Sequence, residues 1–241
     1  MKNYLKKITT SVKNIYYYSN NERLIKHLRQ KGFSIGENCQ LFARKSLWID
    51  STRPFLISIG DNVIITKGVS IITHGYDWAV LKHVYKTIIG SGKSVRIGNN
   101  IFIGPNSIIM PGTIIEDNVI LAAGSVAAGV LESNSVFAGV PAKKIMTLDT
   151  YQNKRKKAVL NEVLLLTNEY IKKYNMFPSQ EIFKEFFDLY IERDINKFGD
   201  QKEYILAKVS PYLEEFLNSK GLFSSFHELE KYLKKELKYD R

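Results

Sequence analysis

Large aliphatic residues recur every six positions through the middle of the chain. The clearest run has a β-branched or small residue four positions after each anchor, and its anchors are Ile97, Ile103, Ile109, Ile115 and Leu121. An α-helix needs apolar residues every three or four positions, and a half-buried strand alternates with a period of two. A period of six therefore predicts a coil of short straight segments, each placing one aliphatic side chain inward. Because six residues cannot bury that side chain alone, successive turns must stack into a solenoid.

A second, less regular block precedes this run. It opens at Ile35 and continues with anchors at Leu41, Leu47, Ile59, Ile65 and Ile71. Arg53 falls on the same grid, and the neighbouring Pro54 predicts a bulge or a looped corner there. The two blocks are out of phase, because the distance from Ile71 to Ile97 is not a multiple of six. Residues 74–96 are therefore predicted to leave the coil as an excursion loop, and loops on rigid scaffolds often carry function.

Helical spacing flanks the coil on both sides. Residues 1–32 are predicted to form a short N-terminal helical cap with a break near Ser19, its apolar positions being Leu5, Ile8, Val12, Ile15, Leu24 and Leu28. Residues 148–241 are predicted to form a C-terminal α-helical appendage of four helices, the last opening with a capping box of Ser225 and Glu228. This appendage could cap the coil, contact a neighbouring subunit or shape a substrate site. Its aromatic residues are expected in a helical core: Phe183, Phe186, Phe187 and Tyr190.

Composition narrows the classes of function. The chain of 241 residues carries a formal net charge of +11 and is 44% hydrophobic. A basic chain suits nucleic acid, a membrane surface or anionic small ligands, but no base-reading motif or recognition helix is present, so nucleic acid is not expected. No apolar run long enough for a membrane span and no apolar signal core occur, so a cytoplasmic location is expected, with peripheral membrane association left open. The single cysteine, Cys39, excludes an intramolecular disulfide and an all-cysteine metal site, and we expect it in the core.

Together, the repeats, the excursion segment ITHGYDW and the closing segment VFAGVPAKKI resemble the hexapeptide-repeat acyltransferases. Within that superfamily the chain is similar to the O-acetyltransferases of sugars and capsule polysaccharides. The resemblance covers about residues 33–147. It implies a mainly β protein with a left-handed parallel β-helix of triangular section. It also implies a homotrimer with active sites at subunit boundaries, acetyl-CoA as the acyl donor, a carbohydrate acceptor and no metal.

The resemblance assigns the general base to His74, which follows the last anchor of the first block. A sugar hydroxyl is a poor nucleophile until its proton is being removed, and neutral imidazole suits that task. An acceptor on the other ring nitrogen would orient the base. Asp77 could play this part or could cap a turn in the loop. Asp50 lies near the place where the family carries an acceptor-binding carboxylate.

The excursion loop supplies further candidates for the acceptor site. Tyr76 and Trp78 could stack on a sugar ring, or they could pack against protein. His83 could touch the acceptor or lie on the surface. The other histidines, His27 and His227, fall in predicted helices and receive no role.

The resemblance places the acyl donor along the second block, in a groove between adjacent turns. The matching positions are Phe102, Gly104, Pro105, Ala123 and Gly124, where small residues permit close approach. Lys143 and Lys144 stand where the family carries basic residues near the nucleotide phosphates. Residues 154–157, all basic, could add to that charge or form a solvated helix face.

Several alternatives follow from the same fold. A β-helix carbonic anhydrase needs three histidines around zinc, and only two lie near the excursion. A sugar nucleotidyltransferase needs a large N-terminal domain that thirty residues cannot supply. N-acetylation of an amino sugar would use the same base and stays open. A non-enzymatic scaffold also stays open, since fold alone does not establish function.

Overall fold

The protein was analysed as a computed structural model that describes residues 16–239. The expected helical positions Leu5, Ile8, Val12 and Ile15 lie outside the described residues. The first complete helix is α2 (Asn21–Gln30), and the side-chain oxygen of Asn20 caps it by accepting hydrogen bonds from the N–H groups of Glu22 and Arg23. Its buried residues, Leu24, Ile25 and Leu28, join the core of the strands that follow. An N-terminal helix therefore covers the beginning of the coil, as expected.

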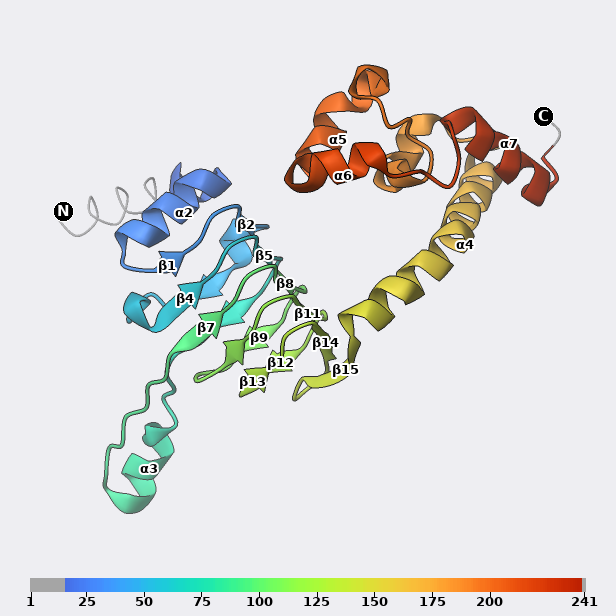
Figure 1. The fold of residues 1–241 in the computed structure, drawn as a ribbon. Coiled ribbons are helices and arrows are strands. Elements are labelled where there is room, and N and C mark those ends of the chain that lie inside the picture. Colours follow the sequence, from blue (N-terminus) through green and yellow to red (C-terminus); the bar gives the residue numbers. More distant parts are fainter. Residues whose placement is uncertain (1–15, 240–241) are drawn as a thin grey trace, which may run out of the picture. The chain divides into compact units, whose positions relative to one another are not determined.

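Within residues 16–239, fourteen short strands form three parallel faces of a coil, and a fifteenth strand pairs antiparallel at its end (Figure 1). The first sheet contains β1 (Ser34–Ile35), β4 (Ile57–Ile59), β7 (Val95–Ile97), β10 (Ile114–Ile115) and β13 (Val130–Leu131). The second contains β2 (Gln40–Leu41), β5 (Ile64–Ile65), β8 (Phe102–Ile103), β11 (Val119–Leu121), β14 (Ser135–Ala138) and the antiparallel β15 (Lys143–Thr147). The third contains β3 (Trp48–Ile49), β6 (Ser70–Ile71), β9 (Ile108–Ile109) and β12 (Val126–Ala127).

The six-residue anchors form buried columns along these sheets. In the second sheet the paired residues are Leu41, Ile65, Ile103, Leu121 and Phe137, all buried. Each aliphatic side chain of this size stabilises the fold by about 1.5–3 kcal/mol when fully buried. Cys39 also lies in this core. The expected fold class, a mainly β parallel coil with helices at both ends, is confirmed.

The register of the first turn differs from the sequence prediction. The residue paired with Ile71 is Ile49, so the anchor of β3 is Ile49 and not Leu47. A turn takes up the two extra residues: Ala43 has a left-handed backbone, and the 3-10 helix η1 (Arg44–Ser46) follows it. Arg53 holds no place on the grid either, because it lies in the loop between β3 and β4, just before the 3-10 helix η2 (Pro54–Leu56). The looped corner predicted at Pro54 is present.

Asparagines fix the corner between the first and second sheets. They all have positive φ and occupy equivalent positions in successive turns: Asn38, Asn62, Asn100, Asn118 and Asn134. The side-chain amides of the first four each donate a hydrogen bond to the amide oxygen of the next asparagine, at 2.8–3.3 Å. Asparagine tolerates the left-handed backbone that this corner requires. The polar ladder therefore aligns the turns from outside while the aliphatic columns align them from inside.

The excursion leaves the corner between the third and first sheets. The chain departs after β6 at Thr73 and returns at Lys93, whose N–H donates to the carbonyl oxygen of Thr73 at 2.9 Å. Between these points lies α3 (Trp78–Tyr85), which has no buried residue. Figure 1 shows α3 away from the strands. The excursion is thus pinned at its base and exposed at its tip.

Residues 154–241 form a second compact unit. It includes most of α4 (Leu148–Tyr174), followed by η3 (Gln180–Leu189), η4 (Ile195–Lys197), η5 (Gly199–Gln201), α5 (Lys202–Val209), η6 (Ser210–Tyr212), α6 (Leu213–Asn218) and α7 (Phe226–Leu237). The aromatic residues expected in its core are buried or half-buried there. Ser225 caps α7 as expected, but the Glu228 carboxylate accepts from the N–H of Ser224 at 2.6 Å, so the capping box is shifted by one residue.

Candidate active site

His74 and Asp50 meet at the corner where the excursion begins. They follow β6 and β3, which pair in the third sheet, and the N–H of Asp50 donates to the carbonyl oxygen of Ile71. Stacking of the two turns therefore brings together residues 24 positions apart. The distance from His74 Nδ1 to Asp50 Oδ2 is 2.6 Å. The histidine side chain is 13% exposed and the aspartate side chain 2% exposed.

Two threonines complete the surroundings of Asp50. The Thr73 hydroxyl donates to Oδ2, while the N–H and the hydroxyl of Thr52 donate to Oδ1 at 3.0 and 2.7 Å. Burial of the carboxyl opposes its ionisation, but hydrogen bonds from Thr73, Thr52 and His74 outweigh that effect. They hold the pKa of Asp50 well below its usual range. Asp50 is consequently a carboxylate at neutral pH and can only accept hydrogen bonds.

This acceptor fixes the tautomer of His74. Because ionised Asp50 has no proton to donate, the neutral imidazole carries its hydrogen on Nδ1 and keeps the lone pair on Nε2. The arrangement leaves Nε2 as the basic atom of a partly exposed ring. A histidine oriented by a buried carboxylate in this way can take a proton from a hydroxyl placed within hydrogen-bond reach.

Contacts across the base of the excursion hold His74 in place. The N–H of Gly75 donates to Ser91 Oγ at 3.1 Å, and Arg53 Nη1 donates to the Ser91 carbonyl oxygen at 3.1 Å. With the bond between Lys93 and Thr73, these contacts tie three segments together: the loop after β3, the departing chain and the returning chain. The backbone on either side of the histidine is thus restrained.

The aromatic candidates of the excursion lie in a row beginning at His74. The Tyr76 ring stands edge-on to the His74 ring with centroids 5.1 Å apart, and Trp78 follows at 6.2 Å from Tyr76. Tyr76 is 68% exposed. His83 is exposed on α3, where its carbonyl oxygen accepts from Lys86 Nζ. The row therefore presents an exposed aromatic face beside the candidate base. His83 is not part of this row.

The carboxylate on the second ring nitrogen is Asp50 and not Asp77. Asp77 stands at the beginning of α3, makes no capping hydrogen bond with its side chain and is exposed. Its Oδ1 lies close to Gly75, since a Cβ built on that glycine would be 2.8 Å away. Asp50 had been assigned to the acceptor on sequence grounds. The pairing places it behind the base instead, away from solvent.

Four of the proposed donor residues come together at a different corner, between the second and third sheets. A Cβ built on Gly104 would lie 2.4 Å from the backbone nitrogen of Ala123, so no side chain fits there. The N–H of Gly124 donates to the carbonyl oxygen of Pro105 at 2.7 Å. Phe102 lies two residues before Gly104, at the start of β8, and is 38% exposed. The four corner residues form a close-packed step between two turns.

Lys143 and Lys144 lie on β15 beside β14, paired with Ala138 and Phe137. Both are exposed, and Lys144 Nζ lies 3.2 Å from Glu132 Oε2. The N–H of Ala142 donates to the carbonyl oxygen of Val126, which places the start of β15 next to the turn that carries Gly124. The two lysines therefore belong to the same end of the coil as that close-packed step.

Comparison with known proteins agrees with this architecture. The family described as bacterial transferase hexapeptide (six repeats) matches residues 94–129. Protein CapG of Staphylococcus aureus is 36% identical over 148 residues, which cover 61% of this chain and 80% of CapG. The chain belongs to the hexapeptide-repeat acyltransferase superfamily.

Solved structures with similar coordinates include a maltose O-acetyltransferase from Clostridium difficile 630. It is 27% identical, with a TM-score of 0.44, over 60% of this chain and 84% of that one. Galactoside acetyltransferase in complex with coenzyme A is 25% identical, with the same TM-score, over 60% of this chain and 80% of that one.

Within this hexapeptide-repeat acyltransferase, sequence reasoning missed Thr52, Thr73, Arg53 and Ser91 as parts of the site. No motif marks them, because each acts through a contact between different turns or loops. Among residues 16–239, no group of three or more histidine, cysteine, aspartate or glutamate side chains could hold a metal ion. In the same part of the chain no helix is long and apolar enough to cross a membrane.

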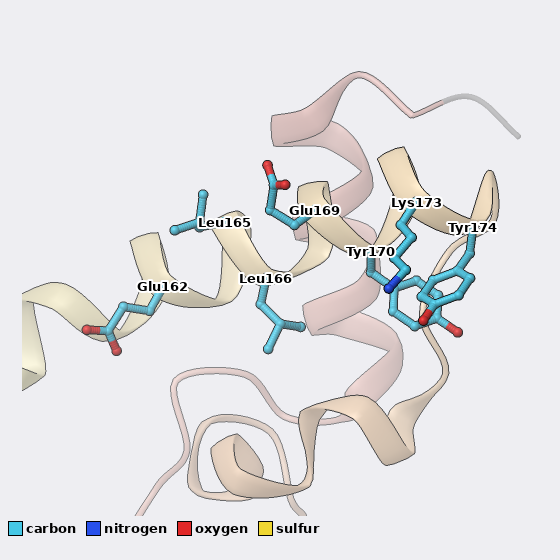
Figure 2. Close-up of a pocket in the computed structure, with 7 residues that line it drawn as sticks. All are labelled: Glu162, Leu165, Leu166, Glu169, Tyr170, Lys173 and Tyr174. Atoms are coloured by element: carbon cyan, nitrogen blue, oxygen red, sulfur yellow. The ribbon is translucent and has the colours of Figure 1, made fainter.

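Two hollows in the second unit contain none of the predicted site residues. One, of about 500 Å³, follows a single face of α4 between Glu162 and Tyr174 (Figure 2). Two leucines and two tyrosines line it together with Glu162, Glu169 and Lys173. The other, of about 530 Å³, lies between α4, η3 and the loop after α6.

Proposed function

We propose that this protein transfers an acetyl group from acetyl-CoA to a hydroxyl group of a carbohydrate, with His74 as the general base. The observation that carries the proposal is the 2.6 Å contact between His74 Nδ1 and the buried, ionised Asp50. It leaves Nε2 basic and the ring fixed. Membership of an acyltransferase superfamily supplies the reaction class, and the acceptor we favour is a surface polysaccharide, an oligosaccharide or its precursor.

The reaction balances with one base. Nε2 takes the proton from the acceptor hydroxyl as its oxygen attacks the thioester carbonyl carbon, giving a tetrahedral oxyanion. Asp50 stabilises the imidazolium that forms, and a backbone N–H group would stabilise the oxyanion. When the carbon–sulfur bond breaks, the leaving thiolate receives the proton from Nε2. The products are the acetyl ester and free coenzyme A, and the base is regenerated.

The substrates would lie on opposite sides of His74. Tyr76 and Trp78 offer aromatic faces on which the apolar face of a sugar ring can stack. The step formed by Gly104, Ala123 and their neighbours would admit the pantetheine arm close to the backbone. Lys143 and Lys144 would pair with the nucleotide phosphates. Asp77 and His83 are less suited to act, because neither contacts His74.

The positions of these groups favour a site shared between subunits of a homotrimer. In one chain His74 lies at the corner between the third and first sheets, whereas Gly104 and Ala123 lie at the corner between the second and third sheets. A neighbouring copy could set its donor corner beside His74. The exposed apolar residues of the excursion would gain cover in such an assembly: Val80, Val84, Tyr85, Ile88 and Ile89.

Mixed trimers test the shared site. His74→Ala removes the base, and Ala123→Trp blocks the donor step with an exposed side chain. After the two inactive proteins are refolded together in equal amounts, random assembly leaves both partners intact at about one interface in four. We therefore expect about a quarter of wild-type turnover. No recovery in verified mixed trimers would place each site within one chain.

The activity itself is tested with isotopically labelled acetyl-CoA, a panel of glycans and mass spectrometry of the products. His74→Ala should abolish transfer while the fold persists, and His83→Ala, a histidine of the same excursion, should retain transfer. Label on an amine instead of a hydroxyl would reassign the reaction to N-acetylation. Full turnover by His74→Ala would exclude the base, and failure to bind acetyl-CoA in calorimetry would favour a scaffold role.

A further inference from the structure

The hollow between α4, η3 and the loop after α6 combines an apolar floor with unpaired positive charge. Its floor is formed by Val159, Phe186, Leu189 and Leu222, and Leu222 is 59% exposed. Lys156 and Lys220 lie on two different walls, one on α4 and the other in the loop. The volume of about 530 Å³ falls within the range of small-molecule sites, which are mostly apolar with a few placed polar groups.

Two of the other charged residues of this hollow already form ion pairs. Arg155 forms a two-point ion pair with Glu162, at 2.6 Å for each contact. Asp188 pairs with Arg193 at 2.9 Å. Glu185 lies near the Tyr204 phenol, and burial together with this carboxylate raises the pKa of Tyr204 to about 12. Among the described residues, neither Lys156 nor Lys220 forms an ion pair, so the hollow is lined by two unpaired ammonium groups and one carboxylate, Glu185, that is not ion-paired either.

Contacts around Arg193 hold the loop that carries Lys220. Arg193 Nη2 donates to both the carbonyl oxygen and Oδ1 of Asp188, and Arg193 Nε donates to Ser219 Oγ at 3.1 Å. The N–H of Phe223 donates to the carbonyl oxygen of Leu189 at 2.8 Å. A Cβ on Gly221 would lie 3.0 Å from that same oxygen, so the glycine lets the loop sit tightly against η3. The wall is therefore formed before any ligand arrives.

We propose that this hollow binds an amphiphilic anion, a molecule with a phosphate or carboxylate head and an apolar body. The head would lie between Lys156 and Lys220, which would form charge-assisted hydrogen bonds with it. The body would cover Val159, Phe186, Leu189 and Leu222 and remove their apolar surface from water. Such a ligand could be a free amphiphile or the headgroup region of a membrane lipid. The site is independent of the chemistry at His74.

The test uses the full chain and decyl phosphate below its critical micelle concentration, with binding measured by calorimetry. Decyl maltoside supplies the same tail without the charge, and inorganic phosphate supplies the charge without the tail. We expect decyl phosphate to bind at least tenfold more tightly than either. Equal affinity for decyl phosphate and decyl maltoside would overturn the proposal.

Variants locate the site. The double variant Lys156→Gln/Lys220→Gln should weaken decyl phosphate binding at least tenfold, and Leu222→Ser should weaken it through the floor. Lys231→Gln/Lys235→Gln on α7 is the control, because it removes the same charge from exposed positions outside the hollow. Equal losses of affinity for decyl phosphate in both double variants would mean that only the overall charge of the protein matters, and would contradict the proposed site.

Vesicles distinguish the two sources of the ligand. Phosphatidylcholine vesicles with and without phosphatidic acid are sedimented with the wild-type chain and with both double variants. Binding that needs phosphatidic acid and is lost only in Lys156→Gln/Lys220→Gln would assign a lipid headgroup. Decyl phosphate binding without vesicle binding would assign a free amphiphile.

Discussion

Asp50→Asn tests the candidate active site most directly. The substitution keeps the size of the side chain, removes its charge and replaces one acceptor oxygen with an amide NH₂ group. In the wild type, Oδ1 accepts two hydrogen bonds from Thr52, and Oδ2 accepts from Thr73 and His74. An asparagine that keeps its oxygen toward Thr52 presents NH₂ to His74 Nδ1. The imidazole must then carry its hydrogen on Nε2, where it cannot accept a proton.

Two effects of the substitution can be given magnitudes: the fall in kcat and the fall in the free energy of unfolding. General-base catalysis is worth about 10²–10⁴-fold, so kcat should fall by about that factor while the KM for acetyl-CoA changes little. The Thr73 hydroxyl loses its acceptor, and the hydrogen bonds to Thr52 and His74 no longer involve a charged group. Because hydrogen bonds to charged groups are the stronger ones, the free energy of unfolding should fall by about 2 kcal/mol.

The stability difference should depend on pH in one direction. The folded-state pKa of Asp50 lies below its unfolded value of about 3.9, so the contribution of its charge is present above that value and is lost as pH falls. The difference between wild type and variant should therefore be constant above about pH 5 and shrink below about pH 4.

Two assays check this reasoning. Release of the coenzyme A thiol in the presence of acceptor gives kcat and KM. Nitrogen NMR of protein labelled in its histidine rings reports the tautomer without any substrate, and His74→Ala identifies the relevant signals. If the wild-type His74 ring carries its proton on Nε2, or if Asp50→Asn keeps full turnover, the assignment of the base is wrong.

Three further substitutions probe the supports of the site and the coil. Thr73→Val removes one donor to Asp50 at constant shape and should lower the free energy of unfolding by about 1 kcal/mol in urea titration; an unchanged midpoint would show that the hydroxyl is dispensable. Asn100→Ala puts alanine, which tolerates a left-handed backbone less well than asparagine, at a φ of 57° and breaks two bonds of the amide ladder. A loss of about 2–3 kcal/mol is expected in the same titration, and a loss below about 0.5 kcal/mol would contradict the structural role of the ladder. Gly104→Ala sets a methyl group 2.4 Å from the backbone nitrogen of Ala123, so the two turns must separate. Its melting temperature should fall and its KM for acetyl-CoA should rise, whereas an unchanged KM would remove this step from the donor site.

The sequence predicted the regular turns well because stacking repeats the same environment. Between Ile97 and Leu121 every segment from one anchor to the next has six residues, so counting by six finds each buried anchor. The count failed where the number of residues between two anchors is not six. The turn at Ala43 adds two residues, which moved the true anchor from Leu47 to Ile49. Local composition gave no sign of this, since both residues are aliphatic.

The same irregularity hid the partner of His74. Asp77 is close in sequence, so it was the natural candidate to orient the ring, whereas Asp50 is brought close only by the pairing of β3 with β6. Finding it from sequence would have required the correct register of the first turn. In the second unit, capping residues predicted where α7 begins. The apolar spacing of residues 180–189 did not distinguish an α-helix from the 3-10 helix η3 that the structure has there, with Phe183 and Phe187 buried.

The irregular parts of the coil are also the parts that build the site. The regular corner between the first and second sheets carries the uncharged asparagine ladder, whereas the irregular corner holds Asp50, a charged group buried away from water. The loop after β3 departs from the repeat and brings Thr52 onto the Asp50 carboxylate, while the excursion departs at the same corner one turn later and supplies Thr73 and His74. Because the flanking strands β3 and β6 are held in register by the solenoid, the two departures meet at a fixed distance. The repeat thus provides rigidity, and two adjacent breaks in it provide the chemistry.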